Sequence, residues 1–482
     1  MHSLLDMSKR KEKGSKQQDP VTGSDMLSNG FHGYKEGYEK LEKIGVTQRN
    51  RDFFNKIFVP VFLMVSTPNF VMLLWYTATK HKGSYGNMVY SISQASTLDS
   101  LRELWGDVHI CSNFALSVVF GYCIWALLLM KCLPGKLVKG PITPKGNTPV
   151  YKDNGFSHYV VTMTTLFLLT VILKTYNLSP SVVYDNFGDI LGTLNVLSAI
   201  FCIFLYIKGL YSPSSTDCGS SGNIIFDYYW GTELYPRVLG FDIKVFTNCR
   251  FGMTIWAVLV YIYALKSYEL HGFVDSMIVS AILQLAYITK FFWWEAGYLS
   301  TIDIMVDRAG YYICWGCLVY VPSLYASVSL YLVNNPVYLG RFWSTFILTC
   351  GLLSISVNYF ADWQKQRVRS ADGDCLIWGK KPNIIRAKYT LEDGQEKESI
   401  LLTSGWWGLS RHFHYIPEIL LALFWTLPAG FENFMPFSYV IFLTILLTHR
   451  SFRDDDKCSS KYGPFWMDYC ERVPHRIVPY LF

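Results

Sequence analysis

Long apolar runs without charge, separated by polar segments, dominate the sequence from residue 53 onward. A transmembrane helix needs about 20 apolar residues, and the longer runs approach or exceed this length: 57–78, 111–130, 156–173, 190–207, 309–333 and 342–361. Shorter runs can also cross a bilayer if they are buried inside a bundle: 251–265, 276–289, 419–431 and 433–448. The pattern predicts an all-α polytopic transmembrane helix bundle of about ten helices, within a range of roughly eight to ten.

Composition narrows the class of protein further. Hydrophobic residues make up 51% of the chain and charged residues only 17%, against a usual charged share of about 25%, which excludes a disordered chain. The net charge of +6 is thinly spread, whereas a nucleic-acid-binding protein carries a clustered basic face. The 12 cysteines are scattered over 482 residues, so no disulfide framework is indicated.

The first 52 residues differ from the rest. They are polar, contain a charge run at 9–13, and lack the apolar segment of a signal peptide. We therefore expect a disordered cytosolic tail over 1–52, followed by one transmembrane domain over 53–482.

Lysine and arginine placement in short loops predicts the orientation. The 131–155 loop holds five lysines against one acid, whereas the 79–110 loop is balanced. The tail and the 131–155 loop are therefore expected in the cytosol. After about ten crossings, the polar segments 362–405 and 449–482 and the C-terminus are expected there too, on the side that holds nucleotide cofactors.

Familiar soluble-enzyme motifs are missing from the sequence. It contains neither a G-x-G-x-x-G nor a Walker A loop. Its ten histidines are dispersed, so we expect no metal site. Cys314 and Cys317 have C-x-x-C spacing but lie within an apolar run, so we expect two small buried residues rather than a zinc or redox centre.

Candidate chemistry concentrates in the C-terminal third. Lys365 and Arg369 follow the 342–361 run and share one helical face at i, i+4 spacing. Two cations beside a membrane cavity suit a phosphate-bearing ligand, and a positive-inside anchor is the alternative. The 404–415 segment combines glycines, two tryptophans, Arg411 and histidines, which suits close approach to a flat or phosphorylated ligand. The 450–469 segment mixes charges and aromatics in the same way.

Acidic side chains at the edge of a bilayer are the other candidates. Glu295, Asp303 and Glu418 lie next to apolar runs, and the first follows Trp293 and Trp294. Such groups mark functional sites by default, because a partly desolvated carboxyl can keep a proton and donate it. An interfacial aromatic belt with snorkelling acids is the alternative reading.

Three motifs in these segments resemble the sterol reductase family, whose membrane enzymes reduce ring double bonds of sterols with NADPH. Residues 231–237 read G-T-E-L-Y-P-R, where the family has G-x-E-x-N-P-R. Residues 405–412 match its G-W-W-G-x-x-R-H. Arg453-Asp454 followed by Lys461-Tyr462-Gly463 and Trp466-x-x-Tyr469 matches its C-terminal signature. The resemblance extends from about residue 54 to Phe482.

The resemblance also indicates a branch of the family. Residues 411–418 read R-H-F-H-Y-I-P-E, where Δ14-sterol reductases typically read R-H-P-N-Y-x-G-D. Three segments resemble the plant-like form of the branch that acts on the C7–C8 double bond of 5,7-diene sterols. They are residues 411–418, the E-L-Y-P-R of 233–237 and the F-W-W-E-A-G-Y of 292–298.

The resemblance implies a location, a substrate, a cofactor and a set of site residues. It implies an enzyme of the endoplasmic reticulum membrane that takes a sterol from the bilayer, contacts membrane lipids and uses NADPH. The expected cofactor-binding residues are Lys365, Arg369, Leu402, Trp407, Arg411, His414, Tyr415, Asp454, Cys458, Lys461, Tyr462 and Tyr469. We expect Glu418 and Tyr298 to be catalytic, as proton donor or relay, and Trp293, Glu295 and Asp303 to contact substrate.

Three alternatives stay open at this point. The first is a Δ14 reductase with the same fold. The second is a membrane methyltransferase of the isoprenylcysteine type, which shares an R-H-P-x-Y-like motif but is shorter. The third is a sterol-binding scaffold without activity, which would be free to lose Lys365, Arg369 or Asp454, all present here.

Overall fold

The computed structural model describes residues 53–94, 97–143, 145–390 and 394–481. The predicted tail over 1–52 lies outside the described residues. Helices dominate the described part, and short two-stranded sheets join some of them.

Within the described residues, eight helical segments are long and apolar enough to cross a membrane. They are Phe54–Lys80 (η3, Phe54–Phe58, and α3, Val59–Lys80), Asn113–Cys132 (α6), Gly155–Thr175 (α7), Phe187–Tyr211 (α9), Val245–His271 (η4, Val245–Met253, and α11, Thr254–His271), Asp275–Trp293 (α12), Tyr311–Asn334 (η5, Tyr311–Tyr325, and α15, Ser327–Asn334) and Gly340–Ser370 (α16). Two further helices follow: α18 (Tyr415–Thr426), extended by η6 (Leu427–Ala429), and α19 (Ser438–Tyr462). Each predicted apolar run overlaps one of these helices, which confirms the polytopic helix bundle.

Short elements connect the long helices. They are α4 (Tyr85–Ser93), α5 (Thr97–Gly106), β1 (Lys136–Lys139), β2 (Val150–Asp153), α8 (Val182–Asp185), α10 (Ile224–Trp230), β3 (Arg237–Val238), β4 (Phe241–Asp242), α13 (Glu295–Tyr298), α14 (Ile302–Met305), β5 (Ile384–Thr390), β6 (Glu396–Leu402), α17 (Trp406–Leu409), η7 (Met435–Phe437) and α20 (Pro464–Arg472).

Two of the short apolar runs belong to helices that are long enough to cross the membrane. The 251–265 run lies within 245–271, and the 276–289 run lies within 275–293. The helix over 245–271 is the more deeply buried, and its fully buried Arg250 interrupts the apolar run. The length of the apolar run underestimates the length of such a helix, because the polar side chains of the helix face protein partners rather than lipid.

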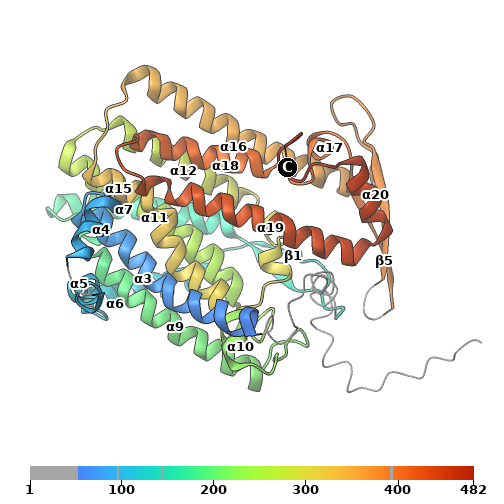
Figure 1. Ribbon diagram of the computed structural model, residues 1–482, viewed down its shortest axis with the longest axis horizontal. Coiled ribbons are helices and arrows are strands. Elements are labelled where there is room, and N and C mark those ends of the chain that lie inside the picture. The colour runs from blue at the N-terminus through green and yellow to red at the C-terminus, as the bar shows by residue number, and fades with distance from the viewer. Residues whose placement is uncertain (1–52, 95–96, 144, 391–393, 482) are drawn as a thin grey trace, which may run out of the picture.

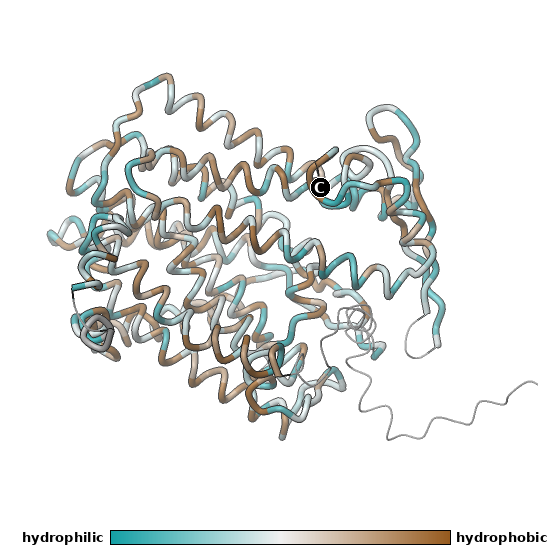
Figure 2. Tube along the Cα trace, in the orientation of Figure 1, coloured by the Kyte–Doolittle hydropathy of each residue, from teal (hydrophilic) through white to brown (hydrophobic). Residues whose placement is uncertain are grey.

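The polar elements gather at the two ends of the bundle. Figure 1 shows α4 and α5 at one end, and β5, α17 and α20 at the other. Figure 2 shows hydrophilic residues along the hairpin, α20 and the second half of α19. The 131–155 loop contacts the 212–237 loop, since Lys145 Nζ donates to Thr216 O at 2.8 Å and Arg237 Nη2 to Val150 O at 2.5 Å. Which compartment each end faces stays a prediction.

The polar segment over 362–405 has more structure than a loop. Helix α16 continues to Ser370, and β5 pairs with β6 in an antiparallel hairpin from Ile384↔Leu402 to Thr390↔Glu396. Ile385, Ala387 and Leu401 pack in one cluster with the aromatic residues of α20, whereas Ile400 and Leu402 pack in another with Val368 and Trp407. The hairpin therefore lies between the ends of α16 and α19–α20.

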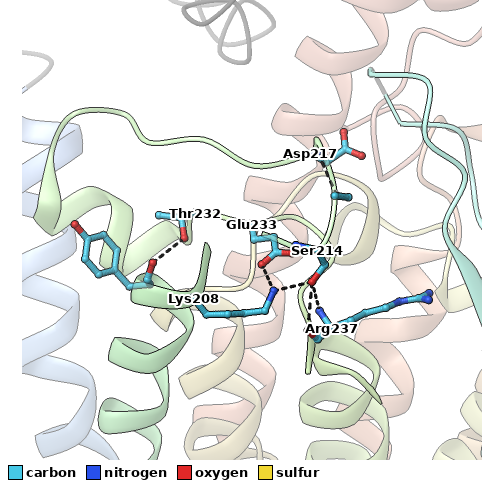
Figure 3. A network of polar contacts seen from close by, with 8 residues as sticks. Lys208, Ser214, Asp217, Thr232, Glu233 and Arg237 are labelled. Carbon is cyan, nitrogen blue, oxygen red and sulfur yellow. Dashed lines mark hydrogen bonds and ion pairs between the residues drawn. The ribbon is translucent and has the colours of Figure 1, made fainter. Parts of the chain in front are cut away.

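The 231–237 motif joins loops at this end of the bundle (Figure 3). Glu233 is 2% exposed; its carboxylate accepts from Lys208 Nζ at 2.7 Å and from the Ser214 amide at 2.5 Å. Gly231 has φ +101°, and a Cβ there would lie 2.6 Å from the Ala309 and Gly310 backbone. The motif thus fixes the start of η5 against the end of α9, so its role is to hold the cavity wall described next.

Candidate active site

One cavity of about 820 Å³ runs through the bundle. Its wall comes from helices α3, α12, α16, α18 and α19, from η5, and from the 294–303 segment. Tyr439 and Lys457 both line it. They are 18 positions apart on α19 (457 − 439), so at 1.5 Å per residue the cavity extends about 27 Å along that helix. Its volume lies within the usual range for ligand sites.

Ten of the predicted site residues line this cavity. They are Tyr298, Asp303, Lys365, Arg369, Trp407, Arg411, His414, Tyr415, Asp454 and Glu418. They come from sequence positions about 150 residues apart, and the fold brings them together, as a single site requires.

The half of the cavity inside the membrane-spanning region is apolar. Leu63 of α3 and Phe442, Leu443 and Leu446 of α19 contribute aliphatic and aromatic surface there. Tyr311 stacks on Trp315 with ring centroids 4.8 Å apart, and both line the same cavity. This half suits a large apolar ligand.

The opposite half is cationic. Lys365 Nζ lies 3.6 Å from the Trp407 ring centroid, and Arg369 Nε donates to Ile400 O at 3.2 Å. Lys365, Arg369 and Lys457 all line the cavity, and none of them makes an ion pair with any residue that the structure describes. Asp362 and Asp454 line the same half but contact none of these three cations directly. Cations without a direct carboxylate partner beside a cavity suit an anionic ligand, and phosphate above all.

An aromatic platform lies beside these cations. Trp407 is buried, its indole N–H donates to Ala361 O at 2.7 Å, and its ring lies 4.9 Å from that of His414. Gly405 has φ +64°, and a Cβ there would lie 2.2 Å from Gln364 Oε1, so the motif requires glycine at this position. That same oxygen accepts from the Trp406 amide at 2.9 Å, which fixes the platform to α16.

The histidines of the platform are neutral. Burial lowers the pKa of His412 to about 4 and holds the pKa of His414 well below its usual value. His412 Nε2 and His414 Nδ1 are buried without a hydrogen-bond partner among the described residues. Buried polar atoms are normally satisfied, so these two nitrogens fit a polar ligand in the cavity.

Arg411 was expected to bind the cofactor, but its guanidinium donates hydrogen bonds to backbone carbonyls of the C-terminal segment. Its Nη1 donates to Val473 O at 2.9 Å and Pro474 O at 3.0 Å, and its amide donates to His475 O at 2.9 Å. Although Arg411 touches the cavity wall, its guanidinium therefore holds the C-terminal segment against the platform.

Five predicted cofactor residues do not line the cavity. Leu402, Tyr462 and Tyr469 are buried in the two clusters under the β5–β6 hairpin, and Cys458 packs against one of them. Lys461 lies 4.0 Å from the Tyr389 ring centroid. They form a layer behind the cavity because the hairpin and α20 need an apolar core of their own.

Trp293 and Glu295 also lie away from the cavity, which differs from the expected substrate contact. The Glu295 carboxylate pairs with Arg250, and both side chains are buried. Arg250 Nη2 also donates to Asn154 Oδ1 at 3.0 Å. A carboxylate buried this deeply needs a countercharge, so Glu295 ties α7 and η4 to α13. Trp293 is 65% exposed and meets only the edge of Phe156 in the ring contacts described.

Tyr298 and Asp303 do lie on the cavity. The Tyr298 hydroxyl accepts from Asn248 Nδ2, and burial raises its pKa well above the usual value, so it keeps its proton. Asp303 pairs with Arg450 of α19. A few residues on, Asp307 pairs with Arg453 of the same helix, so two ion pairs hold the segment after α13 against α19.

Glu418 lies in the first turn of α18 and lines the cavity. Its Oε1 accepts from the Tyr287 hydroxyl at 2.5 Å. Sequence reasoning missed Tyr287, and it also missed Lys290 and Asn358, which pair with each other on the same wall. Lys290 directly follows an apolar run, so an intramembrane cation was the available signal.

Comparison with known proteins identifies the family. Residues 53–482 match the ergosterol biosynthesis ERG4/ERG24 family. A 7-dehydrocholesterol reductase of Arabidopsis thaliana is 52% identical over 86% of this chain and 95% of its own length. The 7-dehydrocholesterol reductase of Xenopus laevis is 38% identical over 78% and 81%, and a Δ(14)-sterol reductase of Methylotuvimicrobium alcaliphilum is 32% identical over 87% and 94%. The chain therefore belongs to the ERG4/ERG24 family of sterol reductases and is a multi-pass membrane oxidoreductase.

Proposed function

We propose that this chain reduces the C7–C8 double bond of a 5,7-diene sterol, with NADPH as the hydride source, in the endoplasmic reticulum membrane. The observation that carries the proposal is one continuous cavity with an apolar half and a cationic half. The 52% identity to a protein named 7-dehydrocholesterol reductase favours the C7–C8 bond. Reduction of the Δ14 bond is the second candidate, on the 32% identity to a Δ(14)-sterol reductase.

The sterol would occupy the apolar half. A sterol dissolves in the bilayer, so it would reach the cavity from lipid rather than from water. Leu63 of α3 and Phe442 of α19 are both only half-buried and both line the cavity. This apolar wall between two membrane helices supports lateral entry.

The cofactor would occupy the cationic half, and the residues there fit it. Lys365, Arg369 and Lys457 would hold its phosphates, and Trp407, His414, Tyr415 and Asp454 would contact its rings and hydroxyls. Leu402, Cys458, Lys461, Tyr462 and Tyr469 would support that half from behind. Bound NADPH supplies a hydride.

A proton must come from the protein. A hydrocarbon double bond accepts a hydride poorly unless a proton is delivered to the other alkene carbon. We assign that proton to the Glu418 carboxyl, which lines the cavity and accepts a hydrogen bond from Tyr287. Tyr298 is the second candidate, because its hydroxyl is on the same cavity and keeps its proton. The saturated bond gains one hydride and one proton, and the carboxylate is then reprotonated.

The test supplies 7-dehydrocholesterol and NADPH to membranes that carry the chain. We expect cholesterol as product, with loss of the conjugated-diene ultraviolet absorption. An 8,14-diene sterol is the matched substrate, and consumption of that sterol alone would move the assignment to the Δ14 bond. Membranes without the chain provide the background, and consumption of neither sterol by membranes that carry it would favour a binding protein without activity.

A further inference from the structure

A tight turn beside the cationic half carries an unusual residue. Ile377 and Lys380 exchange two backbone hydrogen bonds, at 2.8 and 3.0 Å, around Trp378 and Gly379. The two central residues have φ +48° and +78°, as in a type I′ turn, for which Asn-Gly is the favoured pair. Tryptophan is disfavoured at positive φ, and this indole is 63% exposed, so burial within the protein does not compensate. Strain of this kind points to a role for the side chain.

The surroundings of the turn are both apolar and basic. Leu376 is 56% exposed, and Lys380 and Lys381 are exposed. Neither lysine makes an ion pair among the residues that the structure describes. Of the nearby carboxylates, Asp372 is engaged by Arg386, whereas Asp374 is exposed in the same loop. The 376–381 turn therefore presents apolar surface with a net positive charge.

The height of the turn along α16 is fixed by its contacts. Ile377 packs in the same cluster as Val368 of α16. The Trp378 ring meets the edge of Trp406 at 5.1 Å, and the Trp406 amide donates to Gln364. The turn is therefore level with residues 364–368, three to seven positions beyond the apolar run that ends at 361. At 1.5 Å per residue this is roughly 5–10 Å past the hydrocarbon, and the headgroup layer is roughly 5–8 Å thick.

Large apolar side chains face outward on this part of α16. Phe360 is 54% exposed and Trp363 is 42% exposed, and they share the outer face of a helix long and apolar enough to cross the membrane. Tryptophan is enriched at the level of the headgroups, and lysines beside it attract anionic lipids. A soluble protein partner would explain the exposed indole but not its level beside a lipid-facing helix.

We infer that the 376–381 turn is a membrane-surface anchor: Leu376 and Trp378 enter the headgroup layer, and Lys380 and Lys381 bind anionic lipid headgroups there. The anchor also braces the candidate cofactor half. Trp406 touches Trp378 on one side and stacks on Phe413 at 4.8 Å on the other. Membrane contact at the turn thus supports the platform that carries Trp407.

Hydrogen exchange in lipid nanodiscs tests the anchor without using activity. The full chain is compared in phosphatidylcholine alone and with added phosphatidylserine. We expect exchange in the 376–381 peptide to slow by roughly 30-fold with phosphatidylserine, given the usual attraction of two lysines to such a surface. The α20 peptide should not change. The double variant Lys380→Gln/Lys381→Gln should lose the effect, and equal exchange in both lipids would overturn the charge-based part of the proposal.

A second variant separates anchoring from folding. Trp378→Asn creates the favoured turn pair, so the turn itself should persist. A photo-crosslinking benzoylphenylalanine at position 378 should give lipid adducts, whereas the same group at Met467, which is 71% exposed on α20, should give few. Adducts at 378 to added cytosolic proteins instead of lipid, or equal lipid adducts at both positions, would overturn the proposal.

Discussion

The segment between α12 and η5 and the cationic half of the cavity both carry charged side chains, but they treat these charges in opposite ways. Around the segment, every acid described above has a cation: Glu295 with Arg250, Asp303 with Arg450, and Asp307 with Arg453. In the cationic half, Lys365 and Arg369 have no carboxylate partner among the described residues.

The free-energy cost of burying a charge explains why this difference between paired and unpaired charges matters. A buried charge without a partner is expensive, whereas Lys365 is only half-buried and Arg369 is exposed, so water or a ligand can satisfy them. A buried pair is self-sufficient, and removing one member leaves the other uncompensated. The paired region is therefore a structural frame for the cavity, whereas the unpaired region is the ligand-facing part. Each of the following experiments tests this division.

The largest effect is expected in the frame. Arg250→Met leaves Glu295 buried without its partner and should lower the free energy of unfolding by about 3–5 kcal/mol, seen as a large loss of thermal stability in detergent. The double variant Arg250→Met/Glu295→Leu should recover most of the loss. Arg386→Ala, which breaks an exposed pair with Asp372, is the control and should change stability little. No rescue by the double variant would contradict the pairing argument.

Glu418 should affect catalysis rather than folding. The near-isosteric Glu418→Gln keeps a hydrogen-bond partner for Tyr287 but removes the acidic proton. We expect kcat to fall by roughly 10²–10⁴-fold while NADPH binding, measured by fluorescence quenching, is retained. If kcat is retained, or if a large loss of kcat occurs only in Tyr298→Phe, the donor role moves to Tyr298.

Replacement of Arg369 tests which part of the cofactor an unpaired cation of this half binds. If it meets the 2′-phosphate, Arg369→Ala should raise KM for NADPH by roughly 10–150-fold and leave KM for NADH nearly unchanged. Arg367 is the matched control, since it is exposed on the same helix and lies 5.0 Å from the Trp363 ring centroid. An equal effect on both cofactors would assign Arg369 to the shared part of the dinucleotide.

The sequence predicted the bundle well because lipid-facing helices must be apolar along their whole length. It predicted less where polar side chains pair with other groups of the protein. The length of the 245–271 helix was underestimated because Arg250 breaks its apolar run. The β5–β6 hairpin was read as a polar loop because buried positions alternate with exposed ones in β5 and only the last three residues of β6 are buried.

The candidate site shows the same limit. Lys365 and Arg369 were found from their spacing, and the structure places both on the cavity. Glu295 was selected as an acid at the edge of a run, but its partner Arg250 lies 45 positions earlier in the chain. Spacing within one helix is visible in a sequence, whereas pairing between helices is not, and it is pairing that separates the frame from the site.

The smallest expected effect concerns the pH dependence of stability at His412, which belongs to the unpaired group. Its pKa is lowered to about 4 by burial, against about 6.5 in an unfolded chain. The unfolded state therefore binds a proton that the folded state refuses, so stability is constant above pH 6.5 and falls as the pH drops toward 4. At pH 5.5 the loss in the free energy of unfolding is about 1.4 kcal/mol.

His412→Gln should flatten this part of the stability curve in thermal unfolding at pH 7.5 and 5.5, with His475→Gln as the control. An unchanged slope in His412→Gln would mean that Asp454, 3.9 Å from His412 Nε2, pairs with the protonated ring, and His412 would then move from the unpaired group to the paired one.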